Sequence, residues 1–172
     1  MSQQFQSCKP SQMTRESFVS TFADIYEHSP WVAEQSWDSG LDTSHDQIEN
    51  LQQVMASVLM ASEHQAQLDL INAHPDLAGK AAVAGELTEA STSEQAGAGI
   101  HQCNAVEFAR FTELNDAYKA KFGFPFIKAV KGSNRFQILD AFETRINNNH
   151  EQEFATALDE INKIATFRLE TF

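Results

Sequence analysis

Apolar residues recur at intervals of three and four along most of the chain, which is the spacing of one face of an amphipathic helix. In the first half, the pattern predicts helices over residues 18–26, 31–39 and 48–59, and then from a bend near Ser62 to His74. The clearest stripe lies in the third of these helices and consists of Ile48, Leu51, Met55, Val58 and Leu59. Ser44 and Gln47 have the spacing of a capping box and predict where this third helix begins.

The second half opens on small residues and continues with helices. Residues 76–90 are weakly patterned and predict a loop or two short turns. A helix should follow, starting at a capping box made either by Ser91 with Glu94 or by Thr92 with Gln95. Three longer helices are then predicted over residues 104–122, 133–146 and 150–169.

Caps support the first of the longer helices. Asn104 and Glu107 form a capping box at its start, and Gly123 is well placed to end it in a left-handed conformation. Residues 122–132 are the one stretch without an amphipathic pattern, and Pro125 restricts Phe124 to an extended backbone.

No stretch alternates as a strand does. We therefore expect an all-α fold: a single domain over residues 1–172, built as an irregular bundle of about eight helices with one short extended segment.

The charge of the chain limits its partners. The formal net charge is −12, from 24 acidic and 12 basic residues, so the surface should repel nucleic acid and anionic membranes. No apolar run reaches the length of a membrane span, and the first residues contain no apolar signal core. Cys8 and Cys103 fit neither a metal motif nor a disulfide framework, which favours the cytoplasm.

Among six histidines, one has an unusual setting. None of the six lies in a spacing typical of metal ligands, so no metal site is expected. His74 ends a predicted helix directly before Pro75, which fixes the backbone there. This placement fits either a polar helix end or a histidine oriented for proton transfer near neutral pH.

Three further segments have a structural and a functional interpretation each. Residues 91–95 are either a helix cap or a wall that offers a carboxylate and an amide to a ureide-like ligand. Residues 126–130 are either a connection or an extended segment whose backbone groups reach a ligand. Arg168 in the last helix is either a surface or dipole-compensating arginine or a polar contact.

Several of these segments together resemble the family of 2-oxo-4-hydroxy-4-carboxy-5-ureidoimidazoline (OHCU) decarboxylases. The similarity lies in HSPWVAE at 28–34, NAHPDLAGK at 72–80, SEQAGAG at 93–99, FTELNDAYKAKFGFPFIKAVKG at 111–132 and KIATFRL at 163–169. The segments occur in this order across almost the whole chain, and HPDLAGK with FGFPFI forms a specific combination.

The resemblance implies an all-helical, cofactor-free carboxy-lyase of urate breakdown that forms (S)-allantoin. It implies that His74 is the catalytic acid/base and that Glu94 orients His74 or binds the ureido group. The implied substrate contacts are Pro75, Ser91, Thr92, Ser93, Glu94, Gln95, Phe126, Ile127, Lys128, Ala129, Val130 and Arg168. The implied partner is a small ureidoimidazoline.

Other functions stay open from the residues alone. A non-catalytic helical ureide-binding or interaction module would account for the acidic surface and the caps, and a cyclic-amidine hydrolase is a second enzyme class. The sequence does not fix the oligomeric state. Because members of the resembled family often dimerise, a homodimer is one expectation, with Trp31 or Trp37 at its interface.

Overall fold

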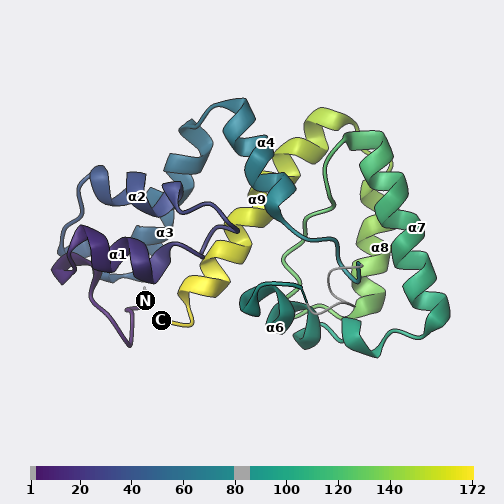
Figure 1. Ribbon diagram of the computed structural model, residues 1–172, viewed down its shortest axis with the longest axis horizontal. Coiled ribbons are helices and arrows are strands. Elements are labelled where there is room, and N and C mark those ends of the chain that lie inside the picture. The colour runs from purple at the N-terminus through teal and green to yellow at the C-terminus, as the bar shows by residue number, and fades with distance from the viewer. Residues whose placement is uncertain (1–2, 80–85) are drawn as a thin grey trace. The chain divides into compact units, whose positions relative to one another are not determined.

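The computed structural model describes residues 3–79 and 86–172, and these ranges are all-α as predicted (Figure 1). Within them lie eight α-helices and no strand. The α-helices are α1 (Arg15–Phe22), α2 (Trp31–Asp38), α3 (Ile48–Ala61), α4 (His64–Ala73), α6 (Glu89–Gly97), α7 (Ala105–Phe122), α8 (Arg135–Arg145) and α9 (His150–Leu169). Three short 3₁₀ helices accompany them: η1 (Pro10–Gln12), η2 (Thr43–Asp46) and η3 (Ile100–Gln102).

Contacts within the chain define two compact units. Unit one comprises Met1–Ala73 and Ile161–Phe172, and unit two comprises His74–Glu160. Helix α9 therefore contributes its first half to unit two and its second half to unit one. The single domain over residues 1–172 stays a prediction.

The core of unit one is built from aromatic rings. Phe22 packs against Phe18, Phe5 and the C-terminal Phe172, with ring centroids 4.8, 5.7 and 5.4 Å away. The Tyr26 hydroxyl donates to Asn162 Oδ1 of α9 at 2.8 Å, which ties the end of the first apolar face to the last helix. These contacts join both ends of the chain into one core.

Helix α3 begins as the apolar pattern predicts, but its predicted capping box is wrong. Gln47 is the N-cap residue and makes no side-chain cap bond. The box in this region belongs instead to η2, where Asp42 and His45 bond to each other's backbone. Ser44 lies inside η2 and donates both its N–H and its hydroxyl to Asp42 Oδ1, so it caps no helix itself.

Unit two is organised by α7, whose predicted caps are confirmed. Asn104 and Glu107 form the capping box, and Gly123 ends the helix with a φ of 79°. On the core face, Tyr118 lies at the centre of an aromatic cluster. Its ring contacts those of Phe122, Phe124, Phe126 and Phe142 at 4.5 to 6.0 Å between centroids.

Two other helices of unit two begin at residues different from those predicted. Helix α6 is capped by Thr88, whose Oγ1 accepts from the Ser91 N–H, so both capping boxes predicted within residues 91–95 are wrong. Helix α8 is capped by Asn134 rather than beginning at Ser133. The loop predicted over residues 76–90 includes 80–85, which lie outside the described residues.

Within the described ranges, no helix combines the length and the apolar character that crossing a bilayer requires.

The capping box of α7 should contribute measurably to stability. In Asn104→Ala, the Glu107 N–H loses its acceptor, so we expect the free energy of unfolding to fall by about 1 kcal/mol. Urea unfolding followed by circular dichroism measures it. The control is Asp116→Ala, an exposed position on the same helix that should not be destabilised. Equal urea midpoints for Asn104→Ala and the unmutated protein would show that the capping box does not stabilise α7.

Candidate active site

His74 begins the turn that follows α4. The last helical residue is Ala73, and Pro75 stops the helix because its ring blocks the next turn. The His74 side chain is buried, with 9% of the residue exposed. Further along the turn, Ala78 adopts a φ of 53°, a left-handed conformation that a residue with a Cβ adopts rarely. Contacts from other elements must therefore hold the turn in place.

Helix α6 supplies the first of these contacts through Gln95. The Ala78 N–H donates to Gln95 Oε1 at 3.1 Å, and Gln95 Nε2 donates to the Asp76 carbonyl at 3.4 Å. Gln95 is buried, so both polar ends of its amide bond to the turn away from water. This arrangement brings the predicted 91–95 segment and the His74 turn together.

The side chains of the 91–95 segment divide between two faces of α6. Ser91 lies one helical turn before Gln95 and is buried with it, and Glu94 is half-buried. Thr92 and Ser93 are exposed, and the Thr92 hydroxyl donates to the carbonyl of Thr88 in its own helix. The buried face therefore offers Ser91, Glu94 and Gln95.

Helix α7 supplies the second support of the turn. Asn115 Nδ2 donates to the Leu77 carbonyl at 2.9 Å, and Lys119 Nζ lies 2.6 Å from Asp76 Oδ2. Asn115 and Lys119 are four residues apart and share one face of the helix. Two helices thus hold consecutive residues of the turn, which limits the freedom of His74.

The extended segment after α7 forms a second part of the site in unit two. As predicted, residues 124–130 have no regular secondary structure. All its buried residues are apolar: Phe124, Pro125, Phe126, Ile127, Ala129 and Val130. The Phe126 ring stacks on Phe142 of α8 at 3.8 Å between centroids and meets Tyr118 edge-on at 5.4 Å. Helix α7 therefore contacts both the His74 turn and this segment.

Two side chains hold the backbone of the segment. Arg145 Nη1 donates to the Ile127 carbonyl at 2.6 Å, and the Ala129 N–H donates to Glu160 Oε2 at 2.7 Å. No peptide bond in the described residues is cis, so the N–H and C=O groups of each peptide point in opposite directions. The Lys128 N–H consequently points away from Arg145, and the Lys128 carbonyl points away from Glu160.

Lys128 differs from its neighbours in the bonding of its backbone. Neither its N–H nor its carbonyl bonds to another residue in the described part of the chain. The residues on both sides of Lys128 are buried, and unpaired backbone groups are rare in such surroundings. A donor and an acceptor on one residue match the N–H and C=O groups of an amide or ureide.

Arg145 itself belongs to a buried polar network. Its Nε donates to Glu153 Oε1 at 2.9 Å, and the same carboxylate accepts from the Tyr118 hydroxyl at 2.7 Å and from Asn148 at 3.0 Å. Glu153 has no exposed surface. Burial, and after it the hydrogen bond to Glu153, raise the pKa of Tyr118 far above its ordinary value, so this hydroxyl remains a donor.

Arg168 lies in unit one, where it is buried rather than at the surface. Its Nη1 is 2.8 Å from Glu27 Oε2 and donates to the Asp24 carbonyl at 3.2 Å. The side chains of Arg168 and Glu27 are 7% and 2% exposed. The interpretation of Arg168 as a surface arginine is therefore wrong, and the residue forms a buried ion pair.

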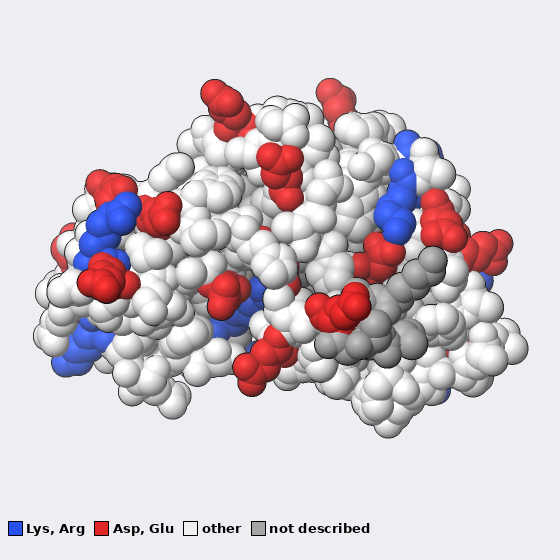
Figure 2. Space-filling view, in the orientation of Figure 1, with Lys and Arg blue, Asp and Glu red and all other residues white. Residues whose placement is uncertain are grey.

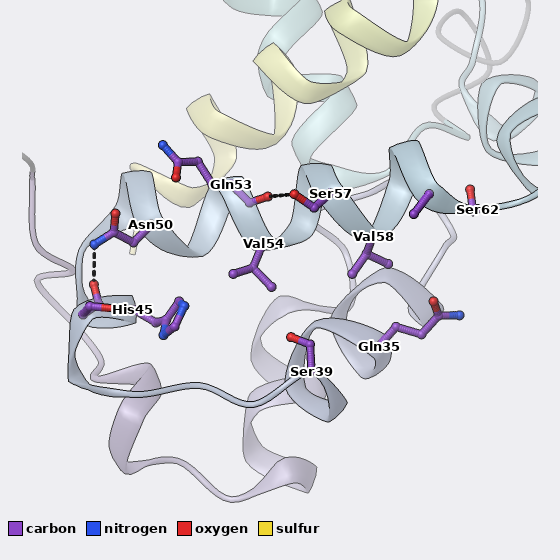
Figure 3. A pocket seen from close by; sticks show the side chains of 11 residues that line it. Gln35, Ser39, His45, Asn50, Gln53, Val54, Ser57, Val58 and Ser62 are labelled. Carbon is purple, nitrogen blue, oxygen red and sulfur yellow. Dashed lines mark hydrogen bonds between the residues drawn. The ribbon is translucent and has the colours of Figure 1, made fainter.

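A surface hollow in unit one contains none of the predicted site residues (Figure 3). It is bordered by α2, η2 and α3, with Gln35, His45, Asn50 and Val58 among its lining residues. Asn50 donates to the carbonyl of Ser44, and Ser57 donates to that of Gln53, so these polar groups bond locally. The hollow shows no convergence of reactive groups on a ligand.

Figure 2 shows acidic side chains spread over the visible face of the protein, with fewer basic ones, in keeping with the net charge of −12. Among the described residues, no group of three or more His, Cys, Asp or Glu side chains is arranged to hold a metal ion.

Sequence reasoning missed the residues behind the site. These are Asn115, Lys119, Arg145, Glu153 and Glu160. A signal for three of them exists: Asn115, Glu153 and Glu160 are polar residues at helical positions that belong to the apolar face, and all three are buried. A polar residue on a core face indicates a buried partner, although the pattern does not name it.

Comparison with known proteins relates the chain to one family. The family model described as OHCU decarboxylase matches residues 11–170. The chain is 42% identical over 160 residues to the 2-oxo-4-hydroxy-4-carboxy-5-ureidoimidazoline decarboxylase of Halalkalicoccus jeotgali, covering 93% of this chain and 87% of that protein. It is 41% identical to the decarboxylase of the same name from Haloferax volcanii, covering 90% and 88%.

Solved structures agree with this relation. A crystal structure of (S)-allantoin synthase superposes with a TM-score of 0.75 at 30% identity, covering 94% of this chain and 51% of that one. A crystal structure of OHCU decarboxylase in the presence of (S)-allantoin has a TM-score of 0.70 at 23% identity, covering 92% and 97%, and shows the same fold. From the match over residues 11–170 and these relatives, the chain belongs to the OHCU decarboxylase family.

Proposed function

We propose that this protein decarboxylates 2-oxo-4-hydroxy-4-carboxy-5-ureidoimidazoline to (S)-allantoin in the breakdown of urate. The observation that carries the proposal is the 42% identity, over 93% of the chain, to a decarboxylase of that name. The geometry of unit two agrees with it: a buried histidine lies on a turn held from two helices, and a buried segment offers an unpaired amide donor and acceptor.

The substrate supplies its own electron sink. The carbon that bears the carboxylate also bears a hydroxyl, and the neighbouring ring carbon is doubly bonded to nitrogen. When the bond to the carboxylate breaks, CO2 leaves and the electron pair moves toward this C=N group, so no organic cofactor has to accept it. A proton added to one face of the enol-like intermediate then gives (S)-allantoin. The protein has to orient the carboxylate out of the ring plane and deliver that proton.

His74 is the group we assign to proton transfer. An imidazole titrates near neutral pH and can act at the substrate hydroxyl and then at the intermediate. Its turn is held by Gln95, Asn115 and Lys119, so the ring starts from a restricted position. General acid–base catalysis benefits from such restriction because the proton must travel between fixed atoms.

The substrate contacts follow from the two parts of the site. We assign the backbone N–H and carbonyl of Lys128 to the ureido group or the ring amide, within the wall formed by residues 126–130. Pro75 and the 91–95 segment line the other side, with Ser91 and Glu94 on the buried face of α6. Gln95 keeps a second N–H on its amide nitrogen for the substrate. Arg168 is assigned to a substrate oxygen.

The setting of the enzyme is part of the proposal. We propose a cytoplasmic homodimer that binds a small ureidoimidazoline and neither nucleic acid nor membrane, as its acidic charge favours. At the proposed interface, Trp31 and Trp37 are both half-buried, and Trp37 packs on Phe18 at 5.4 Å.

Replacement of His74 should abolish most of the activity. The substrate is unstable and is generated freshly by coupling urate oxidation and hydrolysis. We expect His74→Ala to convert it at least about a hundredfold more slowly than the unmutated protein, because the proton-transfer group is gone. Circular dichroism follows the formation of optically active allantoin, and CO2 release distinguishes decarboxylation from ring hydrolysis. His101→Ala, an exposed histidine of unit two, is the matched control and should keep full activity. A His74→Ala enzyme as fast as His101→Ala would exclude His74 as the acid/base.

Glu94 should act through its charge. The α6 cap is Thr88, so Glu94 does not cap the helix, and Glu94→Gln keeps the shape while removing the negative charge. We expect kcat/KM to fall by at least about tenfold. Glu113→Gln, exposed on α7, is the control for the substitution itself. Unchanged kcat and KM in Glu94→Gln would show that an amide can replace the carboxylate in the reaction. Glu94 would then not orient His74 by its charge, and its second acceptor oxygen would not be needed.

A further inference from the structure

The Arg145 side chain is fixed in three directions. Its Nη1 donates to the Ile127 carbonyl at 2.6 Å, and its Nε donates to Glu153 Oε1 at 2.9 Å. Its guanidinium carbon lies 4.3 Å from the centroid of the Phe126 ring, so the planar group also stacks on the segment that it bonds. The side chain is 13% exposed. Arg145 therefore has little freedom to change the position of either donor.

Glu153 explains why this arrangement is rigid. A carboxylate without exposed surface needs charged or hydrogen-bonding partners, and it has three in Arg145, Tyr118 and Asn148. Those partners come from α8, from α7 and from the turn before α9. Moving Arg145 would leave a buried charge with only neutral donors, which is unfavourable.

The consequence appears at the next peptide group. Because the Ile127 carbonyl is held by Arg145, the plane of the peptide between Ile127 and Lys128 is held as well, and with it the direction of the Lys128 N–H. Glu160 holds the following peptide through the Ala129 N–H. The two unpaired groups of Lys128 are thus oriented by residues that lie on the opposite side of the backbone.

We infer that Arg145 is a positioning residue for substrate binding: through the Ile127 carbonyl it orients the Lys128 N–H toward the ureide. The inference rests on the proposed function, because it needs a ureide as the ligand of Lys128. Arg145 itself makes no contact with the substrate in this assignment.

The choice of arginine supports a geometric role. Arg145 Nη2 is buried and has no hydrogen-bond partner in the described part of the chain, which is unfavourable for a group that only had to neutralise Glu153. A lysine could neutralise Glu153 equally well, because its compact ammonium carries the same positive charge. The guanidinium places its donors on separate nitrogens, Nε on Glu153 and Nη1 on the Ile127 carbonyl, whereas a lysine carries all of its donors on one atom.

The test compares two Arg→Lys substitutions. Arg145→Lys keeps the charge beside Glu153 but leaves one donor nitrogen in place of two. We therefore expect KM to rise by at least about tenfold while kcat changes by less than about threefold, as for an interaction present in both ground and transition states. Arg110→Lys is the control, because Arg110 likewise bonds two groups through its guanidinium, here the carboxylates of Glu113 and Glu143, but its side chain is 41% exposed. It should leave both constants unchanged. Calorimetry with (S)-allantoin should show the same loss of affinity for Arg145→Lys alone.

A double variant covers the case in which Arg145→Lys does not fold. Arg145→Met with Glu153→Gln removes both charges of the pair, a replacement that buried ion pairs often tolerate. The Ile127 carbonyl loses its donor there too, so the same rise in KM is expected. Circular dichroism and a cooperative thermal transition establish folding.

The outcomes separate the two proposals. An unmutated protein that neither releases CO2 from the substrate nor binds (S)-allantoin would contradict the proposed function itself. An active unmutated protein with an unchanged KM in folded Arg145→Lys, or with a fall in kcat alone, would overturn the positioning role and leave the proposed function intact. Failure of both variants to fold would also overturn it, because Arg145 would then be a residue of stability.

Discussion

The candidate site depends on how an all-helical chain pairs the backbone groups of its two irregular segments. A helix bonds its own N–H and C=O groups, whereas the turn at 74–78 and the segment at 124–130 cannot, and both contain buried residues. Their partners are therefore side chains from α6, α7, α8 and α9: Gln95, Asn115, Arg145 and Glu160. Each of these side chains is long enough to reach across the gap between a helix and a neighbouring backbone. The backbone N–H and C=O groups that these side chains leave unpaired are the ones that a ligand can use.

Helix α7 couples the two irregular segments. Three of its residues lie within five positions and bond in different directions: Asn115 and Lys119 to the His74 turn, and Tyr118 to Glu153 and the Phe126 ring. A displacement of α7 would therefore move the His74 turn and the segment at 124–130 together. Its capping box and its left-handed Gly123 define the length of this common support, so local helix signals contribute to the precision of the site.

The sequence predicts local features well and long-range pairing poorly. The capping box of α7 and the extended segment after Pro125 follow from neighbouring residues, and both are confirmed. The start of α6 is not predictable in the same way, because Thr88, Ser91 and Thr92 are all acceptable caps and burial of the helix face decides among them. Asn115 and Glu153 lie at positions of the apolar face, which indicates burial, but their partners are 38 and 35 residues away and the pattern does not identify them. Family resemblance indicated the segments that are proposed to face the substrate but not the residues that hold those segments.

The charges of the predicted site suit a reaction that destroys a carboxylate. Arg168 is paired with Glu27, so the pair is close to neutral, and in its proposed role it would recognise an oxygen by the direction of its N–H groups rather than by excess charge. A strong, unpaired cation on the substrate carboxylate would stabilise the ground state, and that stabilisation would be lost as CO2 forms and leaves neutral. The proposed binding through the backbone of Lys128 would avoid this cost, because its ligand is the ureide, which persists unchanged into the product. Precise placement of neutral donors, which the buried network behind residues 126–130 provides, is therefore better matched to this decarboxylation than a positively charged pocket would be.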